Sequence, residues 1–233
     1  MGDKLVILGN GPSLLAHLER GDFDALAGIP TLGMNRIDLL YPLTSWRPTW
    51  YLLMEQMRPF PEPWATLLME HIQPGVERVL LEGRFRRKVT EAINDTALLI
   101  GALAEVRWIH RATCDHYGQL WETHVPSEWH LPELCPFGGS ISGALQLAFM
   151  LGYTDVGLIG CDLGIAESGD HFDPAYKSHV DGLFEEQDDT LRHAHRLASQ
   201  AFGRAGRRVL NLGIGGALEE YLRMDLRRWL NES

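Results

Sequence analysis

Residues 4–14, Lys-Leu-Val-Ile-Leu-Gly-Asn-Gly-Pro-Ser-Leu, restrict the fold of this chain more than any other stretch. An apolar strand runs directly into a Gly-Asn-Gly turn at 9–11, and Pro12 suits the first position of a following helix. The two glycines can adopt positive φ and let the backbone approach a ligand, while the unpaired N–H groups of the first helical turn attract an anion. The stretch therefore predicts a strand–turn–helix unit that binds phosphate, with a plain tight turn before a surface helix as the alternative.

The other apolar runs of the chain are short and alternate with helical segments. This order is typical of a parallel sheet with helices on both faces. With 233 residues, of which 45% are hydrophobic, the chain can bury one full core. We therefore predict an α/β fold with one doubly wound, mostly parallel sheet, in which residues 1–233 form a single nucleotide-binding, transferase-like domain. The predicted strands are Leu5–Leu8, Thr31–Met34, Trp50–Met54, Arg78–Leu81, Val106–His110, Val156–Gly160 and Val209–Leu212, and the predicted helices are 12–20, 64–72, 89–103, 140–151, 185–205 and 217–230.

Two irregular stretches, at about 112–138 and 164–184, interrupt the alternation of strands and helices. Long stretches of this kind inside a compact domain are typical of lids and binding loops. Ligands of parallel sheets bind beyond the carboxyl ends of the strands, so we expect both stretches to cover that edge. The second is rich in glycine and polar residues, and we expect it to be mobile without ligand and to close over one.

The charge and the cysteines exclude some classes of function. The net charge is −10, from 21 basic and 31 acidic residues, which argues against nucleic-acid binding. Cys114, Cys135 and Cys161 are odd in number and widely spaced, which favours reduced, structural thiols and a cytoplasmic protein. Since no apolar run approaches the roughly 20 residues that span a bilayer, any membrane contact is expected to be peripheral.

Polar residues on two predicted helices are expected to face solvent. Arg223, Arg227 and Arg228 are predicted to form a solvated face, with contact to anionic lipid as the alternative. His193 and His195 lie two residues apart, cannot bind one ligand together, and are predicted to lie at the surface.

A second glycine-rich turn precedes the predicted helix at 140–151. Gly138-Gly139-Ser140 offers N–H groups and a hydroxyl to an anion, although capping by Ser140 alone would also explain it. The next strand ends in Gly160-Cys161-Asp162, which places an exposed carboxylate at the same edge of the sheet. Asp162 either belongs to the ligand site or caps the following turn.

These motifs together resemble a known superfamily. Gly-Asn-Gly-Pro-Ser-Leu at 9–14, Met34-Asn35, the Gly-Ser turn at 139–140 and Gly160-Cys161-Asp162 are similar to the bacterial sialyltransferases of glycosyltransferase family 42. They are equally similar to the 6-hydroxymethylpterin pyrophosphokinase-like proteins and to the motility accessory factors that glycosylate flagellin. The similarity covers residues 4–35 and 136–173.

The resemblance implies a nucleotide site made by several of these residues. It places Gly9, Asn10, Gly11 and Ser13 around the nucleotide phosphate and sugar, Asn35 near the ribose or phosphate, and Gly138, Gly139 and Ser140 on the other side of the nucleoside. Asp162 and Asp170 complete the implied nucleotide-binding set. The two phosphate-holding tyrosines of the sialyltransferases correspond to Gly164 and Asp170 here, and an arginine of the family corresponds to Phe137.

The base of the family is a histidine downstream of those tyrosines, and His171 and His179 lie in that region. The ordinary pKa of histidine, about 6.5, suits removal of a proton from an acceptor. We assign His179 as the base and His171 as a contact to the phosphate, because His171 adjoins a lost tyrosine position. Chance exposure on a loop is the alternative for both.

The leading prediction is transfer of a sugar from a nucleotide-activated, CMP-linked donor to a glycan or another acceptor, without a metal or other cofactor. Asp22-Phe23-Asp24 is interpreted as a loop and helix start rather than a metal site. One alternative is a pyrophosphokinase acting on a pterin alcohol, in which Asp162 and Asp170 would bind Mg²⁺. Another is a nucleotide-binding module without catalysis. The sequence leaves open the sugar, the acceptor and whether the chain forms a homo-oligomer.

Overall fold

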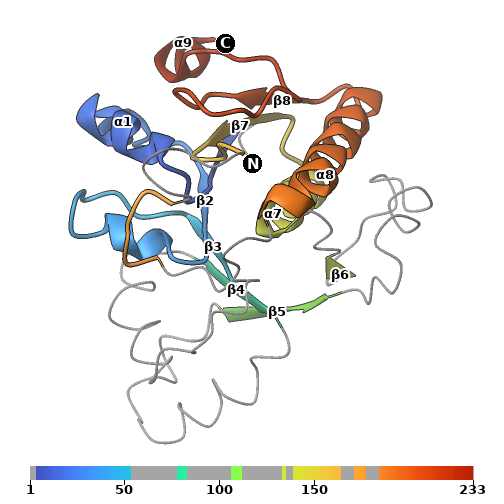
Figure 1. Ribbon diagram of the computed structural model, residues 1–233, viewed down its shortest axis with the longest axis horizontal. Coiled ribbons are helices and arrows are strands. Elements are labelled where there is room, and N and C mark those ends of the chain that lie inside the picture. The colour runs from blue at the N-terminus through green and yellow to red at the C-terminus, as the bar shows by residue number, and fades with distance from the viewer. Residues whose placement is uncertain are drawn as a thin grey trace, which may run out of the picture.

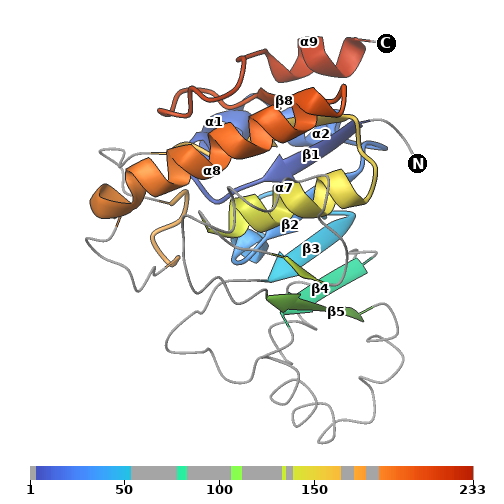
Figure 2. The ribbon, with the colours of Figure 1, turned by 90° about the vertical axis from the view of Figure 1, so that its right-hand side faces the viewer.

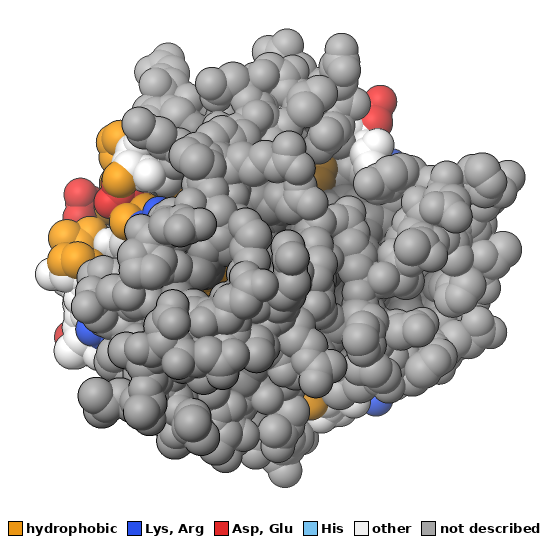
Figure 3. Space-filling model, turned by 90° about the horizontal axis from the view of Figure 1, so that it is seen from below, with side chains coloured by type: hydrophobic (Ala, Val, Ile, Leu, Met, Phe, Trp, Pro, Cys, Tyr) orange, Lys and Arg blue, Asp and Glu red, His pale blue; other side chains and the backbone are white. Residues whose placement is uncertain are grey.

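The computed structural model describes residues 4–53, 78–82, 106–111, 133–134, 139–163, 171–176 and 184–232. For 78–82, 106–111, 133–134 and 184–188 it describes the backbone alone. Seen from below, hydrophobic, basic and acidic side chains of described residues are visible at the left rim of the molecule (Figure 3). The predicted helices at 64–72 and 89–103 lie outside the described residues.

Eight strands form one sheet in the order β6-β5-β4-β3-β2-β1-β7-β8, and each neighbouring pair is parallel. The predicted doubly wound α/β fold is therefore confirmed. The strands are β1 Lys4–Leu8, β2 Thr31–Met34, β3 Trp50–Leu53, β4 Arg78–Glu82, β5 Val106–Arg111, β6 Glu133–Leu134, β7 Asp155–Ile159 and β8 Arg208–Asn211. The described helices are α1 Ser13–Glu19, α2 Asp22–Ala25, the 3-10 helix η1 Ile37–Leu40, α7 Ser140–Met150, α8 Phe184–Arg204 and α9 Leu226–Asn231.

Side chains of β1 alternate between two hydrophobic clusters, as a strand buried on both faces requires. Val6 and Leu8 pack in one cluster with residues of α1, α2 and α9, whereas Leu5 and Ile7 pack in the other with residues of α7 and α8. The ribbon shows the same layers, with α7 and α8 side by side on one face of the sheet and α1 on the other (Figures 1 and 2). In the described part of the chain, no helix is long and apolar enough to cross a bilayer.

The strand order reverses at β1. The chain builds β2 to β6 on one side of β1 and returns to add β7 and β8 on the other. Ligands of open parallel sheets bind at the carboxyl edge near such a reversal. The turn at 9–11 and the segment after β7 meet at this position, since the N–H of Gly11 donates to the carbonyl of Gly160 at 2.8 Å.

Gly9 and Gly11 are required by packing and do not adopt positive φ, so the predicted reason for these glycines is wrong. A Cβ on Gly9 would collide with the carbonyl oxygen of Gly160, and one on Gly11 would collide with the carboxylate of Asp162. Both glycines therefore let the end of β7 approach the β1–α1 turn. The positive φ at this edge belongs to Gly160, at 64°.

We expect Gly9→Ala to lower the free energy of unfolding by about 2–3 kcal/mol, because the added methyl group meets rigid backbone rather than a flexible side chain. Urea denaturation measures this change. Gly203→Ala, in α8, is the control, since its Cβ would meet no atom within 4 Å and should leave stability unchanged or slightly raised. Equal stability of the two variants would contradict this account of the β1–β7 contact.

The predicted helix at 217–230 is wrong for its first half, because helix α9 begins at Leu226. The segment at 217–225 instead runs along β8, where Asn211 donates its N–H to Leu222 and accepts from Met224, both at 2.9 Å. Asp225 then caps α9, accepting from the N–H groups of Arg227 and Arg228. This segment covers the edge of β8, and its Leu218 and Tyr221 join the hydrophobic core.

His195 is buried rather than at the surface, which corrects the prediction. Its ring is 2% exposed, and Nδ1 lies 2.9 Å from the hydroxyl of Tyr221. Burial lowers the pKa of His195 to about 4. The charge of Glu220 opposes this shift, and the charge of Arg192 adds to it. His195 is therefore neutral at pH 7 and joins α8 to the segment at 217–225.

This lowered pKa predicts a stability that falls in acid. The unfolded chain binds a proton at His195 near pH 6.5, whereas the folded chain resists it until about pH 4. The contribution of neutral His195 to the free energy of unfolding is complete above about pH 6.5 and is lost as the pH falls toward 4. The loss is on the order of 3 kcal/mol. Urea denaturation at several pH values should show the difference between wild type and His195→Gln narrowing over this range, with His193→Gln as the control. A constant difference would exclude this role.

Candidate functional site

Asn10 lies at the carboxyl end of β1 and connects three segments of the chain. Its side-chain Nδ2 donates to the carbonyl of Met34 at 3.1 Å, and its own carbonyl accepts from the N–H of Phe172 at 2.9 Å. The residue is 8% exposed, and its Oδ1 has no hydrogen-bond partner among the described residues. A buried acceptor without a partner is costly in a folded protein, so this oxygen is suited to receive a ligand.

Asn35 is fixed by its backbone, which leaves its side chain directed at α7. Its φ is 49°, a left-handed conformation that asparagine tolerates better than most residues. The N–H donates to Leu52 at 3.0 Å, and the carbonyl accepts from the Tyr51 hydroxyl at 2.6 Å. Nδ2 then donates to Oγ of Ser140 at 3.1 Å. Residues 35 and 140 are thus brought together, as the sequence predicts for one site.

The start of α7 is an open helix N-terminus of an 11-residue helix. Gly139, with φ 83°, precedes the helix and provides no side-chain cap. Capping by Ser140, the alternative drawn from the sequence, is not observed, because its hydroxyl accepts from Asn35 instead. No described residue accepts from the N–H groups of Ser140 and Ile141, which are partly exposed. These groups and the helix dipole favour an anion.

The start of α1 differs, because a carboxylate of the protein already lies there. Oδ2 of Asp162 accepts from the N–H of Ser13 at 2.7 Å. Asp162 thus supplies the negative charge that the helix N-terminus favours, and it would repel a phosphate placed beside it. The two helix starts are therefore not equivalent, and α7 is the better position for a phosphate.

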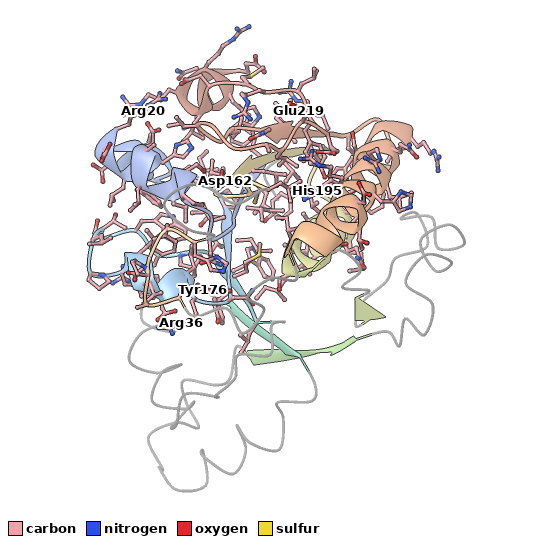
Figure 4. All side chains as sticks on the ribbon, in the orientation of Figure 1. Arg20, Arg36, Asp162, Tyr176, His195 and Glu219 are labelled. Atoms are coloured by element: carbon pink, nitrogen blue, oxygen red, sulfur yellow. The ribbon has the colours of Figure 1, made fainter. Side chains whose placement is uncertain are left out.

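The segment at 171–176 packs against this edge of the sheet. His171 and Tyr176 are in ring contact, with centroids 3.7 Å apart and planes at 37°. Phe172 and Tyr176 are 5% and 7% exposed, so aromatic burial anchors this part of the stretch at 164–184. The mobility of the stretch without ligand stays a prediction. Figure 4 shows Asp162 near the centre, with Tyr176 and Arg36 on the β2 side of it. The guanidinium of Arg36 is held by Asp38 through two hydrogen bonds of 2.9 and 3.0 Å.

Three predicted site residues, Gly138, Asp170 and His179, lie outside the described residues. The lid predicted at about 112–138 also lies outside them, except for the two residues of β6. Of the predicted nucleotide-binding residues that the structure describes, Asn35 and Ser140 meet at the start of α7, and Asn10 bonds to Met34, the residue before Asn35. Ser13 and Asp162 meet at the start of α1.

The arginines of the last segment, Arg223, Arg227 and Arg228, are exposed, as predicted, and the first two also hold the fold together. The guanidinium of Arg227 pairs with Asp22 at 2.8 Å, and Arg223 donates to backbone carbonyls after β8. Asp22 is 1% exposed and also lies 2.9 Å from Nδ1 of His17, so it serves structure. Within the described ranges, no three His, Cys, Asp or Glu side chains are grouped to hold a metal ion.

Sequence reasoning missed the loop at 213–216, Gly-Ile-Gly-Gly, which follows β8 at the same edge of the sheet. The N–H of Ala217 donates to the carbonyl of Asp162 at 2.6 Å, so the loop lies against the start of α1. Three glycines within four residues after a predicted strand were the available signal. The thiol of Cys161, next to Asp162, is a structural group, because burial raises its pKa and keeps it protonated.

A cavity of about 650 Å³ opens at the opposite, amino edge of the sheet. It is bounded by the first residues of β2 and β3, by Tyr153 before β7 and by the chain around α2; its polar and aromatic lining includes Thr31, Thr49, Trp46, Trp50 and Arg47. None of the predicted site residues that the structure describes lines it. The candidate site is therefore defined by the polar groups at the carboxyl edge.

Comparison with known proteins agrees with this architecture. No protein-family model and no curated protein matches the sequence. Among solved structures, the MAf glycosyltransferase from Magnetospirillum magneticum AMB-1 matches 96% of this chain with a TM-score of 0.56 and 16% identity. A crystal structure of a variant of the sialyltransferase CST-II in complex with CMP matches 99% of this chain and 88% of its own length, with a TM-score of 0.52 and 14% identity.

The chain shares its fold with these two solved structures. At these identities the likeness concerns the fold alone. The chain spans about a third of the MAf glycosyltransferase, of which it covers 33%. The sialyltransferase is matched over most of its own length.

Proposed function

We propose that this protein transfers a glycosyl group from a CMP-linked donor to a glycan or another acceptor without a metal ion. The observation that carries the proposal is the polar set at the start of α7. Asn35 donates a hydrogen bond to Ser140. Asn10, at the same edge of the sheet, has a buried Oδ1 with no hydrogen-bond partner among the described residues. A solved sialyltransferase of the same fold is in complex with CMP, which supports a cytidine nucleotide as the ligand.

One phosphate matches the charge that the α7 start can hold. The N–H groups of Ser140 and Ile141 have no acceptor among the described residues, and together with the helix dipole they supply partial positive charge. Asn35 and Ser140 supply neutral hydrogen-bonding groups. A diphosphate would carry more charge and would normally need a divalent cation. This reasoning favours CMP over UDP or GDP and favours glycosyl transfer over pyrophosphoryl transfer.

We assign the two histidines of the stretch at 164–184 to different steps. His171 precedes Phe172, whose N–H donates to Asn10, so His171 is adjacent to the nucleotide site and is assigned to the leaving phosphate. His179 is assigned as the base that removes the acceptor proton. When the bond between the sugar and the phosphate breaks, the phosphate of CMP keeps the electron pair, and the acceptor oxygen forms the new bond to the sugar.

We expect CMP to stabilise the protein in the presence of EDTA. At a concentration about 100 times its Kd, a ligand adds about 2.7 kcal/mol to the free energy of unfolding, which corresponds to a Tm increase of about 5–10 °C for a domain of this size. Thermal unfolding with CMP, UDP, GDP and ATP, each with Mg²⁺ or EDTA, measures the effect. If only ATP with Mg²⁺ raises the Tm of the protein, the pyrophosphokinase alternative is favoured. CMP binding without release of CMP from a CMP-linked sugar would favour a non-catalytic nucleotide-binding module.

A further inference from the structure

The cavity at the amino edge of the sheet lies apart from the candidate nucleotide site. Its volume, about 650 Å³, is within the range of about 300–1,000 Å³ that is typical of small-molecule sites. It is bounded by the first residues of β2 and β3, whereas the candidate nucleotide site lies where the same strands end. A ligand in this cavity would therefore bind independently of the nucleotide.

Two threonines that line the cavity cap each other's strands. Oγ1 of Thr49 accepts from the N–H of Thr31, and Oγ1 of Thr31 accepts from the N–H of Thr49, both at 3.2 Å. A hydroxyl can also donate one hydrogen bond, and neither of these hydroxyls donates to a described residue. Each threonine therefore retains a donor for an acceptor group of a ligand.

Arg47, also in the lining, brings a positive charge that no described carboxylate pairs with. Its Nη1 donates to the carbonyls of Thr44 and Trp46 at 3.1 and 2.6 Å, and its Cζ lies 4.0 Å from the centre of the Tyr41 ring. These contacts fix the guanidinium and leave Nε and Nη2 without an acceptor among the described residues. Nε and Nη2 together can bind both oxygens of a carboxylate.

Aromatic side chains from both faces of the sheet form the apolar part of the lining. Trp46 belongs to the hydrophobic cluster that contains residues of α1 and α2, whereas Trp50 and Tyr153 belong to the cluster that contains residues of α7. All three side chains are buried, so packing fixes the ring edges that border the cavity. A flat ring can make edge or offset contacts with such walls.

We propose that this cavity binds a cyclic carboxylate, whose carboxylate group contacts Arg47, Thr31 and Thr49 and whose ring lies against the aromatic walls. The inference goes beyond the proposed function and does not rest on it. Aromatic acids and acidic sugars both present this chemistry. A cation is disfavoured by Arg47, and a lone phosphate would leave most of the volume unfilled. Asp24, the carboxylate in the lining, is exposed, so water and salt screen its charge.

The test compares acids with their own neutral amides. Isothermal titration calorimetry measures the Kd of indole-3-acetate and glucuronate, which represent the two sources, and of indole-3-acetamide and glucuronamide. The proteins are wild type, Arg47→Gln, Thr49→Val, Thr49→Ser and the control Arg204→Gln, which removes an exposed arginine from the last turn of α8. Circular dichroism checks that each variant is folded, and Thr49→Val carries the test if Arg47→Gln is not.

We expect the acid to bind at least about 10-fold more tightly than its amide in wild type and in Arg204→Gln. Arg47→Gln should remove this difference. Thr49→Val should weaken binding of the acid about 3- to 10-fold, and Thr49→Ser, which keeps the hydroxyl, should not. Tighter binding of indole-3-acetate assigns the cavity to an aromatic acid, and tighter binding of glucuronate assigns it to an acidic sugar.

Three results would overturn the inference. The first is that wild type binds neither acid more tightly than its amide, and the second is that Arg47→Gln and Thr49→Val both bind the acid as wild type does. The third is displacement of the acid by CMP, which would place the acid at the carboxyl edge of the sheet. If wild type does not bind CMP, the proposed function fails, whereas the comparison of acid with amide still decides this inference because it uses no nucleotide.

Discussion

Asn10→Ala combined with Ser140→Ala should abolish measurable CMP binding while the protein stays folded. The first change removes the buried Oδ1, and the second removes the hydroxyl that Asn35 orients at the start of α7. A hydrogen bond to a charged group contributes about 1.5–3 kcal/mol, so losing two should cost about 3–6 kcal/mol, or about 10²- to 10⁴-fold in Kd. Isothermal titration calorimetry measures the affinity, and urea denaturation measures the cost of losing the Asn10–Met34 hydrogen bond.

A matched pair of substitutions away from the site separates the loss of CMP contacts from a general effect of two substitutions on CMP affinity. Ser45→Ala with Asn231→Ala removes the same two side-chain types from the amino-edge cavity and from α9, and it should leave CMP affinity unchanged. The single variants Asn10→Ala and Ser140→Ala should each lower affinity, by amounts that add only approximately because the residues share one site. CMP affinity of the double variant equal to that of wild type would show that the start of α7 does not hold the nucleotide.

Local patterns predicted the sheet because each strand carries its own signal. In β1 the alternate residues Val6 and Leu8, and Leu5 and Ile7, are all apolar, which is the pattern of a strand covered on both faces. The glycine turn after it and Gly139 before α7 mark the strand and helix ends independently of the rest of the chain. Helices α1, α7 and α8 were predicted within one or two residues for the same reason.

Long-range contacts decided what the sequence could not predict. The reason for Gly11 is the carboxylate of Asp162, a residue far along the chain that also bonds Ser13 across 149 positions. The segment at 217–225 has residues that favour a helix, yet the backbone groups of Asn211 at the edge of β8 hold it extended. His195 carries a polar side chain on an amphipathic helix, and only the position of Tyr221 shows why it faces inward.

The site was predicted in part for the same physical reason. Residues at strand ends can be assigned to one edge of a parallel sheet without knowing the structure, and Asn10, Asn35 and Asp162 do follow β1, β2 and β7 at that edge. Their division between two helix starts could not be foreseen. It depends on the carboxylate of Asp162 reaching the N–H of Ser13, and this contact moves the expected phosphate from α1 to α7.

His179→Ala should lower turnover by about 10²- to 10⁴-fold and leave the Kd of CMP nearly unchanged, because a base acts on the acceptor proton and not on the bound nucleotide. His171→Ala should weaken CMP binding as well, since His171 adjoins the segment whose N–H at Phe172 donates to Asn10. Release of CMP from a CMP-linked sugar measures turnover with water as the acceptor, and calorimetry measures affinity. His193→Ala on α8 is the matched histidine control.

The two histidine variants separate the assigned roles by which quantity each one changes. A base with an ordinary pKa should make turnover rise with pH through about 6.5 in wild type, and this rise should disappear in His179→Ala. If His179→Ala instead weakens CMP binding while His171→Ala lowers turnover alone, the two assignments must be exchanged. If both variants turn over the donor as wild type does, neither histidine is the base, and proton removal falls to a group outside the stretch at 164–184.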